Sequence, residues 1–230
     1  MVRRHFYIPL AIGLLLSFGA TAQLLPTYGE ERAGLSAFTF LKLPIDPAST
    51  GVGGASLAMT DHSFGALINP ALISGGNQQG VFSANRALGG GINHDFVALT
   101  KARENGQHIA LTLNSLSTGS ILERTVWQPE GTGATTSAAL TCVGLGVSQA
   151  FSEYFHAGVQ LKYGLEQLGV FRAHNVYLDL GFLYKLDIAD LQFAAALTNF
   201  GPNTPLSNMP VGQESALAAT PQMFSMGIQW

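Results

Sequence analysis

The six histidines are the first candidates for metal chemistry. They stand at His5, His62, His94, His108, His156 and His174. Protein zinc sites use imidazole or thiolate ligands at short, regular spacings, and no pair of these histidines has such a spacing. We therefore expect no metal site. His108 and His156 fall on the polar faces of predicted strands, where hydrogen bonding inside the fold is their expected role.

Nucleophilic or phosphate chemistry would need specific glycine-rich turns. No Gly-Xaa-Ser-Xaa-Gly segment is present to hold a serine on a strained turn. Gly51-Val52-Gly53-Gly54-Ala55-Ser56 is similar to a phosphate loop, but no Lys-Ser or Lys-Thr follows to open a helix. A tight turn at Gly53 and Gly54 that starts a short helix is the expected structure.

The single cysteine, Cys142, cannot form an intramolecular disulfide. It alternates with glycines in a strand-like segment that has no basic neighbours, so we expect inert packing rather than a reactive thiol. Charged residues make up 11% of the chain and the net charge is −3, so nucleic acid is not an expected partner. The sequence predicts a non-enzymatic protein without a cofactor.

The elements that must position these residues are short strands. From about Gln78 onward apolar and polar residues alternate, and glycine, asparagine, serine and aspartate separate the segments. In the clearest segment one face carries Phe155, Ala157, Val159, Leu161 and Tyr163, and the other carries His156, Gly158, Gln160 and Lys162. Residues 175–184 repeat this division. Each segment has roughly the ~9–11 residues of a tilted membrane strand.

Residues 1–22 have the features of a cleaved signal peptide. Arg3 and Arg4 precede an apolar run from Phe6 to Phe18, and Ala20-Thr21-Ala22 follows. The run is shorter than the ~20 residues of a spanning helix. We expect cleavage after Ala22, and an uncleaved anchor is the alternative.

Alternation alone does not separate a soluble β-sandwich from a membrane barrel, because strands have two different faces in both. Three further features favour a barrel: the signal peptide, the aromatic residues at the ends of the apolar faces, and the glycine and alanine on the other face. We predict an all-β fold, namely a transmembrane antiparallel β-barrel in the outer membrane of a Gram-negative bacterium.

Lys162 and Asp179 lie on the polar faces of consecutive predicted strands. A lysine that faced lipid at the membrane midplane would cost roughly 2–4 kcal/mol. We therefore expect both charges to face the lumen and to form a structural ion pair across the hairpin.

Connection lengths predict about eight strands within residues 78–230. Short turns are expected at 102–105, 152–153 and 187–190, and longer connections at 87–93, 116–137, 167–173 and 201–220. Outer-membrane barrels alternate short periplasmic turns with long external loops. To keep this alternation, residues 121–127 are interpreted as an extension of one external hairpin.

Residues 23–77, rich in Ala, Gly, Ser and Pro, contain three motifs in order: Ala33-Gly34-Leu35-Ser36-Ala37-Phe38-Thr39-Phe40-Leu41-Lys42-Leu43-Pro44, Gly51-Val52-Gly53-Gly54-Ala55-Ser56-Leu57-Ala58 and Asn69-Pro70-Ala71-Leu72. With the acidic Asp61, this pattern resembles the PorV/PorQ family, and PorQ is the closer likeness. Phe155-Xaa-Xaa-Gly158-Val159, Asp179-Leu180-Gly181 and Asn199-Phe200-Gly201 match family strand segments. Asp46-Pro47-Ala48-Ser49 replaces the Ala-Arg pair that the family usually shows.

The resemblance implies a barrel related to the FadL-type transporters, with residues 23–77 as a plug. Its plug motif here comprises Gly53, Gly54, Asp61, Asn69, Pro70 and Ala71. An eight-stranded barrel is filled by its own side chains, whereas the family's barrel has about fourteen strands. We therefore expect that the chain lacks C-terminal strands, the alternative being a plug outside the barrel. We hypothesise that Asn69 ties the plug to the wall; a plain surface turn is the other possibility.

The resemblance also implies service in type IX secretion, with cargo handled or attached at the cell surface. The expected partners are outer-membrane lipid, other secretion subunits and cargo proteins. Recognition would lie in the external loops 116–137 and 201–220. The alternatives are a FadL-like channel for hydrophobic small molecules, which a continuous apolar pocket beside the plug would favour, and a purely structural anchor.

Overall fold

The computed structural model describes residues 36–59, 64–75, 80–187, 190–205 and 217–230. The chain divides into two compact units, Met1–Glu31 and Arg32–Trp230, and all described residues belong to the second. The predicted signal peptide, residues 23–35 of the predicted plug, and Asp61 lie outside the described residues.

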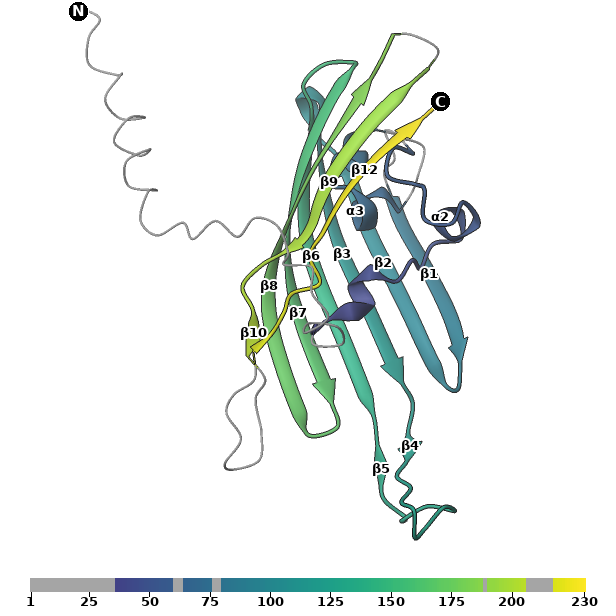
Figure 1. Ribbon diagram of the computed structural model, residues 1–230. Helices are drawn as coiled ribbons and strands as arrows, with labels where there is room; N and C mark the ends of the chain where they lie inside the picture. Colours follow the sequence, from purple (N-terminus) through teal and green to yellow (C-terminus); the bar gives the residue numbers. More distant parts are fainter. Residues whose placement is uncertain (1–35, 60–63, 76–79, 188–189, 206–216) are drawn as a thin grey trace, which may run out of the picture. The chain divides into compact units, whose positions relative to one another are not determined.

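The second unit is built around one antiparallel sheet of eight strands (Figure 1). In spatial order these are β1 (Gly80–Gly89), β2 (Ile92–Ala102), β3 (Gln107–Thr118), β6 (Ala138–Ala150), β7 (Phe155–Leu168), β8 (Phe171–Lys185), β9 (Gln192–Phe200) and β12 (Met223–Gln229). The all-β class is confirmed. Among the described residues β1 and β12 each pair on one side only, so the sheet is open.

Short pairs and helices complete the described elements. Two small hairpins, β4 (Ile121–Leu122) with β5 (Thr135–Thr136) and β10 (Thr204–Pro205) with β11 (Leu217–Ala218), lie outside the large sheet. The helices are η2 (Thr39–Lys42), α2 (Pro47–Gly51), α3 (Gly65–Ile68), α4 (Leu72–Gly75) and η3 (Glu104–Gly106). None of the helices in the described ranges is long and apolar enough to cross a membrane.

The buried face of the sheet is polar and rich in small residues. On β6 the buried side chains alternate from Leu140 to Ser148 through Cys142, Gly144 and Gly146. Most of the apolar side chains of β3, β6, β7, β8 and β12 point to the opposite, exposed face; there Leu161 is 56% exposed. This relation is the reverse of a soluble sandwich, in which the apolar faces pack together.

At one end of strands β1, β2, β3 and β6, a row of polar residues bounds the apolar face. Asn85, Asp95, Ser115 and Thr141 form one row across β1, β2, β3 and β6. Asn85 Nδ2 donates to Asp95 Oδ1 at 2.5 Å, and the Ser115 and Thr141 hydroxyls lie 3.4 Å apart. At the other end Phe155, Tyr184 and Phe193 form an aromatic row across β7, β8 and β9.

The described part of residues 36–75, here called the helical segment, packs against the buried face of the sheet. Phe38 N donates to Glu166 on β7 at 2.7 Å, and the Phe38 ring meets Tyr177 on β8 edge to face at 5.5 Å. At the far end of the segment, Ser74 Oγ lies 2.6 Å from Ser148 Oγ on β6. The segment therefore covers several strands, as Figure 1 shows for α3 and the sheet.

Two connections predicted to be long are two-residue turns. The β1–β2 turn is Gly90–Gly91 and the β7–β8 turn begins at Gly169, so the expected long connections at 87–93 and 167–173 were wrong. These glycines have φ values of 60°, 79° and 58°, a region that glycine adopts without steric cost and that tight hairpins need. Residues 121–127 do extend the β3–β6 hairpin, as predicted, because β4 pairs with β5 outside the large sheet, and the external position of this hairpin stays a prediction.

Glycines on the buried face set how closely the helical segment approaches. A Cβ atom on Gly158 would overlap the Pro70 carbonyl, and one on Gly181 would overlap Asn69 Oδ1 and lie 2.9 Å from Pro70 Cδ. Hence Asn69 and Pro70 rest directly on the backbone of β7 and β8.

We predict that Gly181→Ala lowers the free energy of unfolding by roughly 1–3 kcal/mol, because the added methyl group must push Asn69 away from β8. The measurement is the urea midpoint of the refolded protein, together with protease cleavage within residues 36–75. Gly51→Ala is the matched control, since no atom lies within 4 Å of its added Cβ. Identical midpoints for the two variants would contradict this account of the contact.

Candidate functional site

Asn69 links the helical segment to the sheet. It is fully buried and follows the last residue of α3 in an extended conformation, as expected before a proline. Its Nδ2 donates to Leu57 O at 3.2 Å and to Phe182 O on β8 at 3.3 Å, while its Oδ1 accepts from Ala71 N at 3.0 Å. Asn69 therefore ties this segment to the sheet and is not part of a surface turn. That the segment is a plug and the sheet a barrel wall stays a prediction.

The Gly53-Gly54 turn ends a helix instead of starting one. Asp46 caps α2 by accepting Ser49 N at 2.7 Å, and Pro47 occupies the first turn, where a missing N–H costs nothing. Gly53 and Gly54 have φ values of 65° and 86°, and Gly54 N donates to Ser49 O. The expected helix after this turn was wrong, because Asp46 and Pro47 place the helix before it.

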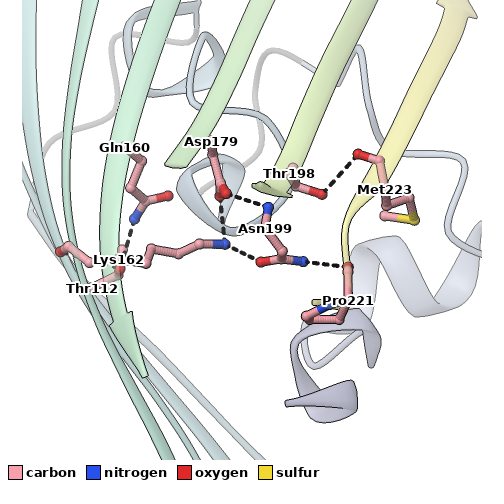
Figure 2. A network of polar contacts seen from close by, with 9 residues as sticks. Thr112, Gln160, Lys162, Asp179, Thr198, Asn199, Pro221 and Met223 are labelled. Carbon is pink, nitrogen blue, oxygen red and sulfur yellow. Dashed lines mark hydrogen bonds and ion pairs between the residues drawn. The ribbon is translucent and has the colours of Figure 1, made fainter. Parts of the chain in front are cut away.

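Lys162 and Asp179 form the predicted ion pair. Lys162 Nζ lies 2.6 Å from Asp179 Oδ2, and the two side chains are 11% and 1% exposed (Figure 2). They are diagonal neighbours on β7 and β8, since Gln160 is the direct partner of Asp179. The pairing itself is confirmed, whereas their position facing a lumen remains a prediction. Both charges therefore lie on the buried face of the sheet.

Asn199 completes the polar network, a role that the sequence analysis did not predict for it. It lies at a β-bulge, where the β8–β9 register shifts between Leu178 and Leu180, and its φ is 56°. The bulge frees its backbone N–H, which donates to Asp179 Oδ1 at 2.7 Å. Its side chain accepts from Lys162 Nζ at 2.5 Å and donates to Pro221 O at 3.3 Å. Figure 2 shows this series of contacts, which runs from β7 to the segment before β12.

The Asn199-Phe200-Gly201 segment contains the signal that could have revealed the bulge. Asparagine tolerates positive φ better than most residues. A Cβ atom on Gly201 would overlap Val176 O, so glycine is required next to the bulge. The three residues therefore form a bulge that places Asn199 beside the ion pair.

A cavity of about 760 Å³ lies beside this network. Lys162, Thr198 and Asn199 line it from the sheet, and Gly53 and Gly54 line it from the helical segment. Apolar side chains that also line it include Leu41, Leu43, Leu57, Ile68, Met226 and Ile228, with Lys42 and Arg86 as further cations. Its size and mixed lining fit a binding site for an amphipathic molecule.

Two of the three buried histidines in the described ranges pair with polar side chains. His94 Nε2 lies 2.7 Å from Asn114 Oδ1, and His156 Nδ1 lies 3.2 Å from Ser74 Oγ. His108 is also buried on this face, but neither of its ring nitrogens has a hydrogen-bond partner among the described residues, so the hydrogen bonding expected for it was wrong, whereas that of His156 is confirmed. Within the described ranges no group of three or more histidine, cysteine, aspartate or glutamate side chains could hold a metal ion. Cys142 is buried on the same face.

Comparisons with known proteins do not add a family assignment. No protein-family model and no curated protein matches the chain. The likeness to the PorV/PorQ family therefore rests on the motifs quoted above, and the role it implies is a proposal.

We predict that Asp179→Ala lowers the free energy of unfolding by roughly 3–5 kcal/mol, because it leaves the buried Lys162 ammonium without its carboxylate. The double variant Lys162→Met/Asp179→Leu should recover most of this loss, since apolar groups can replace a buried ion pair. Urea unfolding in detergent micelles or vesicles measures both.

Glu130→Ala, at an exposed site on the β4–β5 hairpin, is the control and should shift stability by less than about 0.5 kcal/mol. Additive losses in the double variant would mean that the two charges are not coupled.

Proposed function

We propose that the eight-stranded sheet is part of the wall of a transmembrane β-barrel in the outer membrane of a Gram-negative bacterium. The observation that carries this proposal is the inverted burial of the strands: small and polar residues are covered, and leucine, valine, phenylalanine and tyrosine are exposed. Lipid is the surrounding in which such an exposed face is stable.

The dimensions of the apolar face support this location. On β7 it runs from Phe155 to Leu165, ten residue steps, which at about 3.3 Å each is about 33 Å. A strand tilt of about 40° turns this length into about 25 Å across the membrane, the height of the apolar band in outer-membrane barrels. The aromatic row at Phe155 and Tyr184 fits an interfacial girdle.

If the sheet lies in lipid, its open edges at β1 and β12 require other strands as pairing partners. Unpaired backbone N–H and C=O groups cost several kcal/mol each in hydrocarbon, so membrane-spanning sheets close into barrels. In the proposed protein, further strands pair with β1 and β12. A barrel wider than eight strands has room for the helical segment, which then acts as a plug.

Within this membrane location, the proposed role is non-enzymatic service in type IX secretion. The motifs shared with the PorV/PorQ family support it, as does the plug-like packing of Asn69-Pro70-Ala71 on β7 and β8. The protein would bind secretion subunits and handle or attach cargo proteins at the cell surface, through connections at the end of the sheet that carries the β4–β5 hairpin.

A second candidate is a FadL-like channel for hydrophobic small molecules. The cavity of about 760 Å³ between the helical segment and the sheet favours it, because its lining is largely apolar and includes Lys42, Arg86 and Lys162. A purely structural anchor has no use for such a cavity.

The membrane location predicts that arginine destabilises the protein at one exposed apolar position and has no effect at another. Leu161→Arg, in the middle of the apolar face of β7, should destabilise the protein folded in lipid vesicles by roughly 2–4 kcal/mol. Val126→Arg, at the tip of the β4–β5 hairpin, should leave it unchanged. If Leu161→Arg folded as well as Val126→Arg, or if the mature protein were soluble and monodisperse without detergent, the apolar face would not contact lipid.

The secretion role predicts specific co-purification from detergent-solubilised outer membranes. Tagged protein should recover type IX secretion subunits in a ratio that persists through gel filtration. A tagged outer-membrane barrel of unrelated function serves as the control. Reproducible absence of these subunits, with an acyl lipid bound in the cavity instead, would contradict the secretion role and favour the channel.

A further inference from the structure

The β4–β5 hairpin ends in two almost fully exposed apolar side chains. Val126 is 92% exposed and Trp127 is 91% exposed. They occupy a two-residue turn, in which Thr125 N donates to Gln128 O at 3.3 Å and Gln128 N donates to Thr125 O at 3.1 Å. Such turns favour glycine, asparagine and aspartate, so local structure does not account for valine and tryptophan here.

The hairpin below the tip is held in one shape. Glu123 N donates to Ala134 O and Thr132 N donates to Glu123 O, both at 2.9 Å. Gly131 has a φ of 121°, and a Cβ atom there would lie 2.5 Å from Leu122 Cδ2, so Leu122 packs directly on the turn backbone. The tip is therefore presented by an ordered element, which reduces the entropy that binding has to remove.

The tip lies beyond the reach of lipid in the proposed orientation. The apolar face of β3 ends at Ser115, and eight further residue steps separate Thr118 from Val126, a length of about 26 Å when extended. Figure 1 shows β4 and β5 projecting past the neighbouring turns. Lipid contact therefore does not explain the exposed indole, and a protein surface does.

We propose that Val126 and Trp127 are the anchor with which this protein binds another protein. The partner presents an apolar pocket that encloses the indole and offers an acceptor to its Nε1–H. Tryptophan is among the residues most enriched at the centres of interfaces, where a few side chains carry most of the binding energy. Glu123, Arg124 and Glu130 surround the tip as exposed charges and supply the polar rim of the interface.

This inference deepens the proposed function and rests on its membrane orientation. The first experiment excludes lipid as the occupant. The chain has two tryptophans, so Trp230→Phe leaves Trp127 as the single reporter. In vesicles of brominated phosphatidylcholine its fluorescence should be quenched by aqueous acrylamide and not by the lipid. Quenching by the brominated lipid would overturn the proposal.

The second experiment identifies the partner and measures the anchor. A photo-crosslinking amino acid at position 127, in cells that make the protein natively, should give one defined adduct, whereas the same residue at position 170 should not. Val170 is the matched control, because it is 71% exposed in the two-residue β7–β8 turn at the same end of the sheet. Binding of the purified adduct partner to the intact protein is then measured with and without substitution.

Trp127→Ala should raise the Kd at least about tenfold, as expected for a hot-spot residue, and Val170→Ala should leave it unchanged. Absence of an adduct specific to position 127, or equal Kd values for the two variants, would overturn the anchor. Failure of the membrane location is separate, because it is detected by solubility without detergent.

Discussion

Each strand of the large sheet has two faces, and the helical segment of residues 36–75 covers the one that carries glycine, alanine and hydrogen-bonding side chains. The close contact of Asn69 and Pro70 with Gly158 and Gly181 makes this arrangement possible, because any larger side chain at those glycines would hold the segment away. Once this face is covered, the apolar face remains outside. The proposed membrane location follows from that division.

Within the part of the chain that the structure describes, hydrogen bonds and the Lys162–Asp179 ion pair join the strands on the covered, polar face of the sheet. Lys162, Asp179 and Asn199 satisfy one another across three strands. Each of these contacts joins two different strands, so the network holds β7, β8 and β9 together on the covered face. Asn199 in particular connects the ion pair to the segment that leads into β12.

Features that depend on local alternation were predictable from the sequence. The β7 and β8 faces, the Lys162–Asp179 pairing and the role of Asn69 before a proline follow from period-two patterning and known backbone preferences. The tight Gly90–Gly91 turn and the Asn199 bulge were missed, because both depend on positive φ at single residues. The glycine contacts were unpredictable, since they join segments about ninety residues or more apart. The open edges of the sheet also have no local signature.

The central claim is that the exposed side chains of β7 contact lipid. Its most direct test is site-directed spin labelling, one position at a time from Val159 to Tyr163, in a Cys142→Ala background in lipid vesicles. Collisions with oxygen, which concentrates in lipid, should dominate at Val159, Leu161 and Tyr163 and fall at the residues between them. If a water-soluble nickel complex collided more often at those three positions, the apolar face would contact water and the account would be wrong.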